Sequence, residues 1–203
     1  MKDKSPLLFS IFSFAFILLI IWFIGISAAG LEWNENIESL NKNWNSLNSI
    51  STIWRLEALA VCAIAWIAFN LSGHSKWWTL VAIGHILMLM EYIIMLGGYN
   101  QVTSEEMYNV LNGMANWTFI AANFIWVAGM LGIYWRESKV IKAVGVLLSA
   151  SSLLLIAAIY FGLGAQTELT SVAMPVVLLL YAFNAYYGLV LFKRVKTEVN
   201  TSS

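Results

Sequence analysis

The sequence predicts an all-α, polytopic membrane protein with six transmembrane helices and both termini in the cytoplasm. Of its 203 residues, 60% are hydrophobic and only 11% are charged, whereas an ordinary soluble domain carries about 25% charged residues. Six apolar stretches have the roughly 20 residues that a helix needs to cross about 30 Å of hydrocarbon. The formal net charge is zero, so no global field favours nucleic acid as a partner. The lipid bilayer is the partner that this composition predicts.

The predicted spans follow one another through a single domain, residues 1–203. We expect them at Pro6–Gly30, Ser51–Leu71, Trp77–Gly98, Gly113–Trp135, Val140–Gly162 and Ser171–Phe192. The apolar run of the first span exceeds the roughly 7–15 residues of a signal-peptide core, so we interpret it as a retained helix. Pro175 near the start of the sixth span predicts a modest kink. The polar tail, about residues 196–203, is predicted to be disordered.

Basic residues set the predicted orientation, because lysine and arginine in short loops stay on the cytoplasmic side. One set of span ends carries nine of them and the other set carries two, out of the 11 in the chain. The basic set is Lys2, Lys4, Lys76, Arg136, Lys139, Lys142, Lys193, Arg194 and Lys196, against Lys42 and Arg55. Both termini are therefore expected inside the cell, and the loops Leu31–Ile50 and Tyr99–Asn112 outside.

The first outer loop, residues 31–50, has an amphipathic pattern. Its apolar residues recur at spacings of four and three, which places them on one helical face; they are Trp33, Ile37, Leu40, Trp44 and Leu47. Such a helix lies in the outer membrane interface or packs over the bundle as a lid. The pattern supports both interpretations equally.

Three charged residues fall inside the predicted spans, toward their outer ends. At about 1.5 Å per residue, Arg55 lies roughly 5 Å below the outer boundary, Glu57 about 3 Å deeper, and Glu91 about 10 Å from the same surface. Arg55 and Glu57 are about 200° apart around their helix, so they cannot both point at one neighbour. A charged side chain deep in lipid costs about 2.5–3.5 kcal/mol, and such residues usually turn inward, pair, or mark a path.

Neutral polar residues extend this set. Asn116 enters the same outer layer from the fourth span, and His85 and Asn123 lie near the middle of the bilayer. Asn116 and Asn123 are two helical turns apart and therefore share a stripe. From the coincidence of depth we expect an ion pair between Arg55 and Glu91 in an outward-opening polar recess between the second, third and fourth spans.

The function that these residues favour is binding or transport of a small molecule or ion through that recess. The predicted ligand-binding set is Arg55, Glu57, His85, Glu91, Asn116 and Asn123. An alternative is a structural or accessory subunit of a membrane complex or homo-oligomer, in which polar groups only fasten helices through hydrogen bonds worth about 0.6 kcal/mol each.

An intramembrane metal-dependent enzyme is the least favoured function. Catalytic zinc needs three protein ligands, and the predicted depths separate His85 from Glu57 by much of half a bilayer. The chain has no Walker-type loop or dinucleotide fingerprint, and no serine–base spacing typical of a hydrolase. The sequence therefore predicts no catalytic residues, no metal site and no cofactor.

Two stretches of the sequence resemble a known family. "IWRLEAL", which opens the second span, and "FIAANFIWVAGMLGIYWRESKVIKAVGVLL", Phe119 to Leu148, are similar to an uncharacterised bacterial family of six-helix integral membrane proteins. The resemblance implies a six-helix fold in a bacterial cytoplasmic membrane. It carries no established activity over to this chain.

Overall fold

The computed structural model describes residues 4–28, 37–38, 48–162 and 166–201, and in these ranges the chain is helical without strands. The long helices are α1 (Ser5–Ala28), α3 (Asn48–Leu71), α4 (Trp77–Ile93), α5 (Glu105–Tyr134), α6 (Lys139–Tyr160) and α7 (Gln166–Thr201). A π-helical turn, η1 (Ile94–Gly98), and a 3-10 turn, η2 (Tyr99–Gln101), follow α4. Within the described ranges, six helices are long and apolar enough to cross a membrane, which confirms the predicted class and number of spans.

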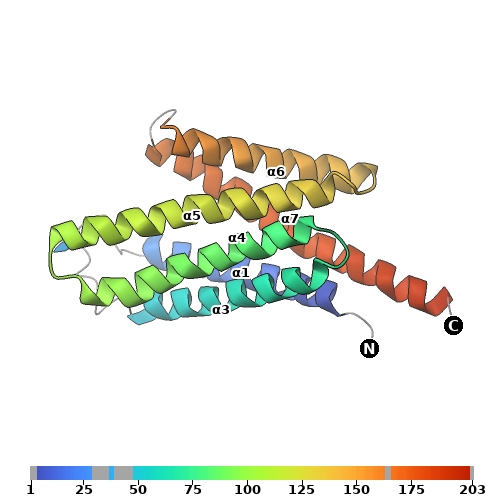
Figure 1. The fold of residues 1–203 in the computed structure, drawn as a ribbon, viewed down its shortest axis with the longest axis horizontal. Coiled ribbons are helices and arrows are strands. Elements are labelled where there is room, and N and C mark those ends of the chain that lie inside the picture. The colour runs from blue at the N-terminus through green and yellow to red at the C-terminus, as the bar shows by residue number, and fades with distance from the viewer. Residues whose placement is uncertain (1–3, 29–36, 39–47, 163–165, 202–203) are drawn as a thin grey trace.

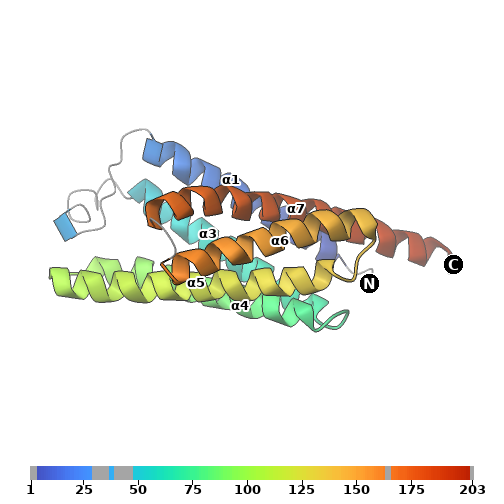
Figure 2. The same cartoon turned by 90° about the horizontal axis from the view of Figure 1, so that it is seen from above.

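The six long helices form a closed ring. Each packs against the helices before and after it in the chain, and α1 also packs against α7. Figure 2 shows α4 and α5 side by side along one face and α1 and α7 along the opposite face. The first turn of α1 and the last turn of α7 lie at the same end of the bundle (Figure 1), together with the α3–α4 loop and the α5–α6 turn. We call this the basic end, because it carries Lys76, Arg136, Lys139, Lys193 and Arg194.

Aromatic side chains fill the space between four of the helices. Tyr181 of α7 contacts the rings of Phe16 from α1, His85 from α4 and Trp126 from α5, with centroid distances of 4.9, 6.1 and 4.6 Å. The close approach of α4 to α5 depends on Gly84, where a Cβ atom would lie 2.5 Å from Trp126 Cβ and 2.6 Å from its backbone nitrogen. Only glycine leaves room for this contact.

Two helices are longer than the spans predicted for them. α5 begins at Glu105 rather than near Gly113, because the hydroxyl of Ser104 accepts a hydrogen bond from the backbone N–H of Met107 (3.2 Å) and caps the helix. Acidic residues in the first turn, Glu105 and Glu106, also suit the positive end of the helix dipole. α7 extends from Gln166 to Thr201, so its backbone is helical over most of the tail predicted to be disordered.

The predicted amphipathic segment, residues 31–50, lies mostly outside the described residues. Of its apolar stripe only Ile37 is described. Ile37 packs against the core of the bundle, and its backbone N–H donates a hydrogen bond to Oε2 of Glu105 (3.2 Å).

Candidate functional site

Glu57 and Tyr92 connect α3 to α4 inside the bundle. The Glu57 side chain is buried, with 5% of its surface exposed, and its Oε2 accepts a hydrogen bond from the Tyr92 hydroxyl at 3.1 Å. Tyr92 is also buried. A carboxyl group in hydrocarbon is costly unless it is bonded, so this hydrogen bond explains how Glu57 is accommodated between the two helices.

Glu91 belongs to the same cluster, but Arg55 does not. Glu91 is partly buried and lies within electrostatic range of Glu57, Tyr92 and Tyr181. Arg55 is exposed, and within the described part of the chain it forms no ion pair with Glu91, so the predicted pairing is wrong. The physical reason is helical geometry: when Glu57 faces the bundle, a residue about 200° away on the same helix must face outward.

His85 is held by two hydrogen bonds in the middle of α4. Its Nδ1 lies 2.8 Å from the backbone oxygen of Val81, and because a carbonyl oxygen can only accept, this nitrogen carries a proton. In the neutral ring Nε2 then accepts from the hydroxyl of Tyr181, at 3.1 Å. Tyr181 thereby links α7 to His85 of α4. We call Glu57, Glu91, Tyr92, His85 and Tyr181 the central polar cluster.

The two predicted asparagines have different surroundings. Asn123 is buried; its amide nitrogen donates to the backbone oxygen of Phe119 (2.8 Å) and its Oδ1 accepts from the indole N–H of Trp126 (3.0 Å). Asn116 is exposed on the surface of α5. Of the two residues on this stripe, only Asn123 is therefore buried, and both hydrogen bonds of its side chain stay within α5.

The structure thus brings together three of the six predicted residues, Glu57, Glu91 and His85. Asn123 adjoins them through Trp126, whose ring lies 5.5 Å from that of His85. Sequence reasoning missed the two tyrosines that connect the cluster. Tyr181 and Asn184 are three residues apart and therefore share a face of α7, but a tyrosine in a span usually serves as an aromatic packing residue.

The described His, Cys, Asp and Glu residues contain no group of three that could hold a metal ion. His85 uses both ring nitrogens within the protein, on Val81 and Tyr181. The predicted alternative of an enzyme that uses His85 with the glutamates therefore gains no support from the geometry of the cluster.

A second polar site lies at the basic end, in a cavity of about 320 Å³. Segments from α1, the α3–α4 loop, α4, the α5–α6 turn and α7 contribute to its wall. Its polar lining consists of His74, Ser75, Arg136, Glu137, Tyr187 and Arg194. None of these six residues is in the predicted site, because they come from segments far apart in the sequence.

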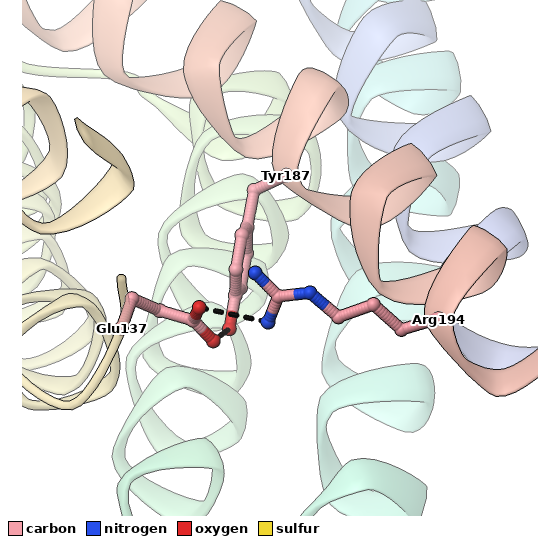
Figure 3. A network of polar contacts seen from close by, with 3 residues as sticks. All are labelled: Glu137, Tyr187 and Arg194. Atoms are coloured by element: carbon pink, nitrogen blue, oxygen red, sulfur yellow. Dashed lines mark hydrogen bonds and ion pairs between the residues drawn. The ribbon is translucent and has the colours of Figure 1, made fainter. Parts of the chain in front are cut away.

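Glu137 organises one side of this cavity (Figure 3). Its Oε1 accepts a hydrogen bond from the Tyr187 hydroxyl (2.6 Å), and its Oε2 accepts one from Nη1 of Arg194 (2.8 Å). Partial burial acts to raise the pKa of Glu137, but the hydrogen bonds from Tyr187 and Arg194 and the charge of Arg194 outweigh it and hold the pKa below its usual value. Tyr187 and Arg194 are seven residues apart on α7 and therefore share a face, a signal that the sequence does contain.

A third feature is an apolar groove of about 350 Å³ between α5 and α6. Aromatic residues line it, among them Trp117, Phe124 and Tyr160. Trp117 and Phe124 are exposed on the outer surface of the bundle, where a membrane-spanning helix meets lipid chains.

Fold and site together define a polytopic membrane protein with a buried polar cluster and a charged cavity at one end. Comparison of the chain with protein families, with curated proteins and with solved structures found no match. The resemblance to a bacterial six-helix family stays a prediction.

Proposed function

We propose that the protein binds or transports a small molecule or ion, and that the central polar cluster is its intramembrane binding site. The observation that carries the proposal is the buried carboxyl group of Glu57, which is bonded to the Tyr92 hydroxyl and to no cation among the described residues, with the partly buried Glu91 next to Tyr92 in the chain. Two carboxyl groups that interact inside hydrocarbon cannot both keep an uncompensated negative charge. A proton or a small cation is the partner that such a pair recruits.

The surroundings of the pair support this role. Intramembrane acidic residues that face a bundle interior commonly mark ion or proton pathways. The π-helical turn η1 follows shortly after Glu91, and π turns in helices frequently occur at functional sites because they interrupt the regular backbone hydrogen bonding. Tyr92 supplies a hydroxyl group that is bonded to Glu57, and Tyr181 supplies one that is bonded to His85.

The proposal includes an orientation and a location. The basic end faces the cytoplasm, since basic residues are retained there, so that both termini are inside the cell and Glu57 lies nearer the outer surface. The location is the cytoplasmic membrane of a bacterium, which the resemblance of the second, fourth and fifth spans favours.

A ligand screen on detergent-purified protein tests the proposal. Thermal stability is measured against alkali cations, divalent metals and small metabolites for the wild type, E57Q, E91Q and the control E106Q, which removes an exposed carboxylate at the start of α5. A ligand of the cluster at 100 times its Kd stabilises the folded protein by about 2.7 kcal/mol. We expect this gain in the wild type and E106Q and its loss in E57Q and E91Q; equal gains in all four proteins would exclude the cluster as the site.

Proton binding needs a direct readout. Infrared difference spectroscopy across a pH titration detects the carbonyl stretch of a protonated carboxylic acid. We expect a band that disappears in E57Q or E91Q and persists in E106Q. If neither variant changes the spectrum and no ligand is found, the binding function is wrong.

The alternative function, a structural or accessory subunit, is favoured by a different observation. Several buried polar groups are bonded pairwise, as in the hydrogen bond from the Tyr134 hydroxyl to Oδ1 of Asn184 and in that from the Ser10 hydroxyl to the backbone oxygen of Ala185. These contacts fasten helices without creating a ligand site. Under this alternative E57Q lowers stability and changes no ligand response, and the protein co-purifies with partner subunits.

A further inference from the structure

The cavity at the basic end is built differently from the central polar cluster. Its apolar lining includes Leu71, Trp78, Ile133 and Leu191, and the first three of these residues belong to the buried core of the bundle. Its volume of about 320 Å³ is at the lower end of the roughly 300–1,000 Å³ found for small-molecule sites. The cavity is therefore large enough for a small ligand and is not simply an imperfection in packing.

Charge indicates which ligand the cavity suits. Two guanidinium groups, Arg136 and Arg194, and one carboxylate, Glu137, line it, which leaves a surplus of positive charge. Glu137 bonds to Nη1 of Arg194, whereas Arg136 is exposed and forms no ion pair with any described residue. Arg136 is thus free to bind an anion.

The restrained position of Arg194 also favours the binding of an anion. Its bond to Glu137, itself held by Tyr187, restrains the guanidinium at the wall of the cavity, and its other N–H groups have no partner among the described residues. Guanidinium groups match phosphate oxygens through two parallel hydrogen bonds. The hydroxyl of Ser75 on the α3–α4 loop is a further polar group at the same wall.

We propose that the cavity at the basic end binds a phosphate group, with Arg136 and Arg194 as its two cationic contacts. The phosphate belongs either to a small soluble phosphate ester or to the headgroup of an anionic phospholipid, since both present the same oxygens at this depth. This site is independent of the central polar cluster, and its test does not depend on the outcome for Glu57 and Glu91.

The first arm of the test uses inorganic phosphate with protein in an uncharged detergent. Affinity is measured by isothermal titration calorimetry, with sodium chloride at equal ionic strength as the reference. The variant is R136Q, and the matched control is K193Q, which removes the same charge from an exposed position next to Arg194 on α7. We expect phosphate binding by the wild type and K193Q, and binding at least about tenfold weaker in R136Q, because a charge-assisted bidentate contact is lost.

The second arm distinguishes a lipid from a soluble ester. The protein is placed in nanodiscs of phosphatidylcholine with phosphatidylglycerol, and retained lipid is counted by native mass spectrometry. One supporting result is selective retention of phosphatidylglycerol that is lost in R136Q and kept in K193Q. This result identifies the lipid as the source of the phosphate group. Binding of inorganic phosphate that requires Arg136, without lipid selectivity, supports the site with a soluble ester as the source.

One pattern overturns the proposal. If R136Q and K193Q behave alike in both arms, whether both bind or neither does, the cavity is not a phosphate site. Should R136Q fail to fold, R136K replaces it: lysine keeps the charge but loses the planar fork, so weaker phosphate binding than in K193Q supports the site and equal binding contradicts it.

Discussion

Tyr92 on α4 donates a hydrogen bond of 3.1 Å to the buried carboxyl group of Glu57 on α3. The two residues are 35 positions apart in the sequence, and their contact joins two helices at the level where the chain carries its intramembrane acidic groups.

Replacement of Tyr92 by phenylalanine should lower stability. Y92F leaves the buried Glu57 without its donor, which costs about 1–3 kcal/mol, more than the average of about 0.6 kcal/mol for one interhelical hydrogen bond in a membrane. The free energy of unfolding in mixed micelles measures the effect. The control is Y186F, which removes the same hydroxyl from an exposed tyrosine on α7; equal stability of the two variants would contradict the structural role of the Glu57–Tyr92 bond.

The contact between α4 and α5 should be sensitive to one methyl group. In G84A the added Cβ would overlap Trp126 Cβ and the backbone of Trp126 and Ala122, and backbone atoms cannot move aside cheaply. We expect a loss of about 1–3 kcal/mol, measured by unfolding in mixed micelles. In G113A, by contrast, the Cβ meets no atom within 4 Å, so alanine should stabilise α5 by about 0.5–1 kcal/mol.

Acid should weaken the junction between the α5–α6 turn and α7. The pKa of Glu137 is lowered in the folded protein, so near its ordinary value of 4.5 the unfolded chain binds more protons than the folded chain. The stability that Glu137 contributes is therefore complete well above pH 4.5 and is lost as the pH falls through the lower folded-state pKa.

Unfolding measured from neutral pH into this acidic range checks the prediction. E137Q should be less stable than the wild type at neutral pH and should lose less stability on acidification. E106Q should leave the acid-dependent loss in place. A wild type and an E137Q variant with parallel pH profiles would show that the contacts of Glu137 with Tyr187 and Arg194 add nothing to stability.

The proposed orientation can be tested with single cysteines. In a C62A background, T103C lies between η2 and α5, and S138C lies in the turn between α5 and α6, at the basic end; both native residues are exposed. If the basic end faces the cytoplasm, a membrane-impermeant thiol reagent labels T103C in intact cells and labels S138C only after the membrane is opened. The reverse pattern would invert the topology.

The spans themselves were predictable from the sequence because the features that define a span, its length and its apolar composition, are local. A backbone that crosses hydrocarbon must bond to itself and must carry about 20 apolar residues in a row, so length and composition were enough to place six helices. The helices differ from the predicted spans at their ends. Ser104 extends α5 outward by capping it, and the helical backbone of α7 continues to Thr201, where no rule about the hydrocarbon layer applies.

By itself, then, the sequence determined that six stretches are long and apolar enough to cross a membrane, and position along each helix predicted the depth of their residues. Tertiary structure decided which way the polar side chains point and which residues they contact. Arg55 and Glu57 are predicted to lie at similar depths, yet only Glu57 faces the bundle, because helix rotation is set by packing against α4 rather than by hydropathy. Glu137 and Arg194, 57 residues apart, meet only because α7 closes the ring, and no local pattern encodes a contact between segments that folding alone brings together.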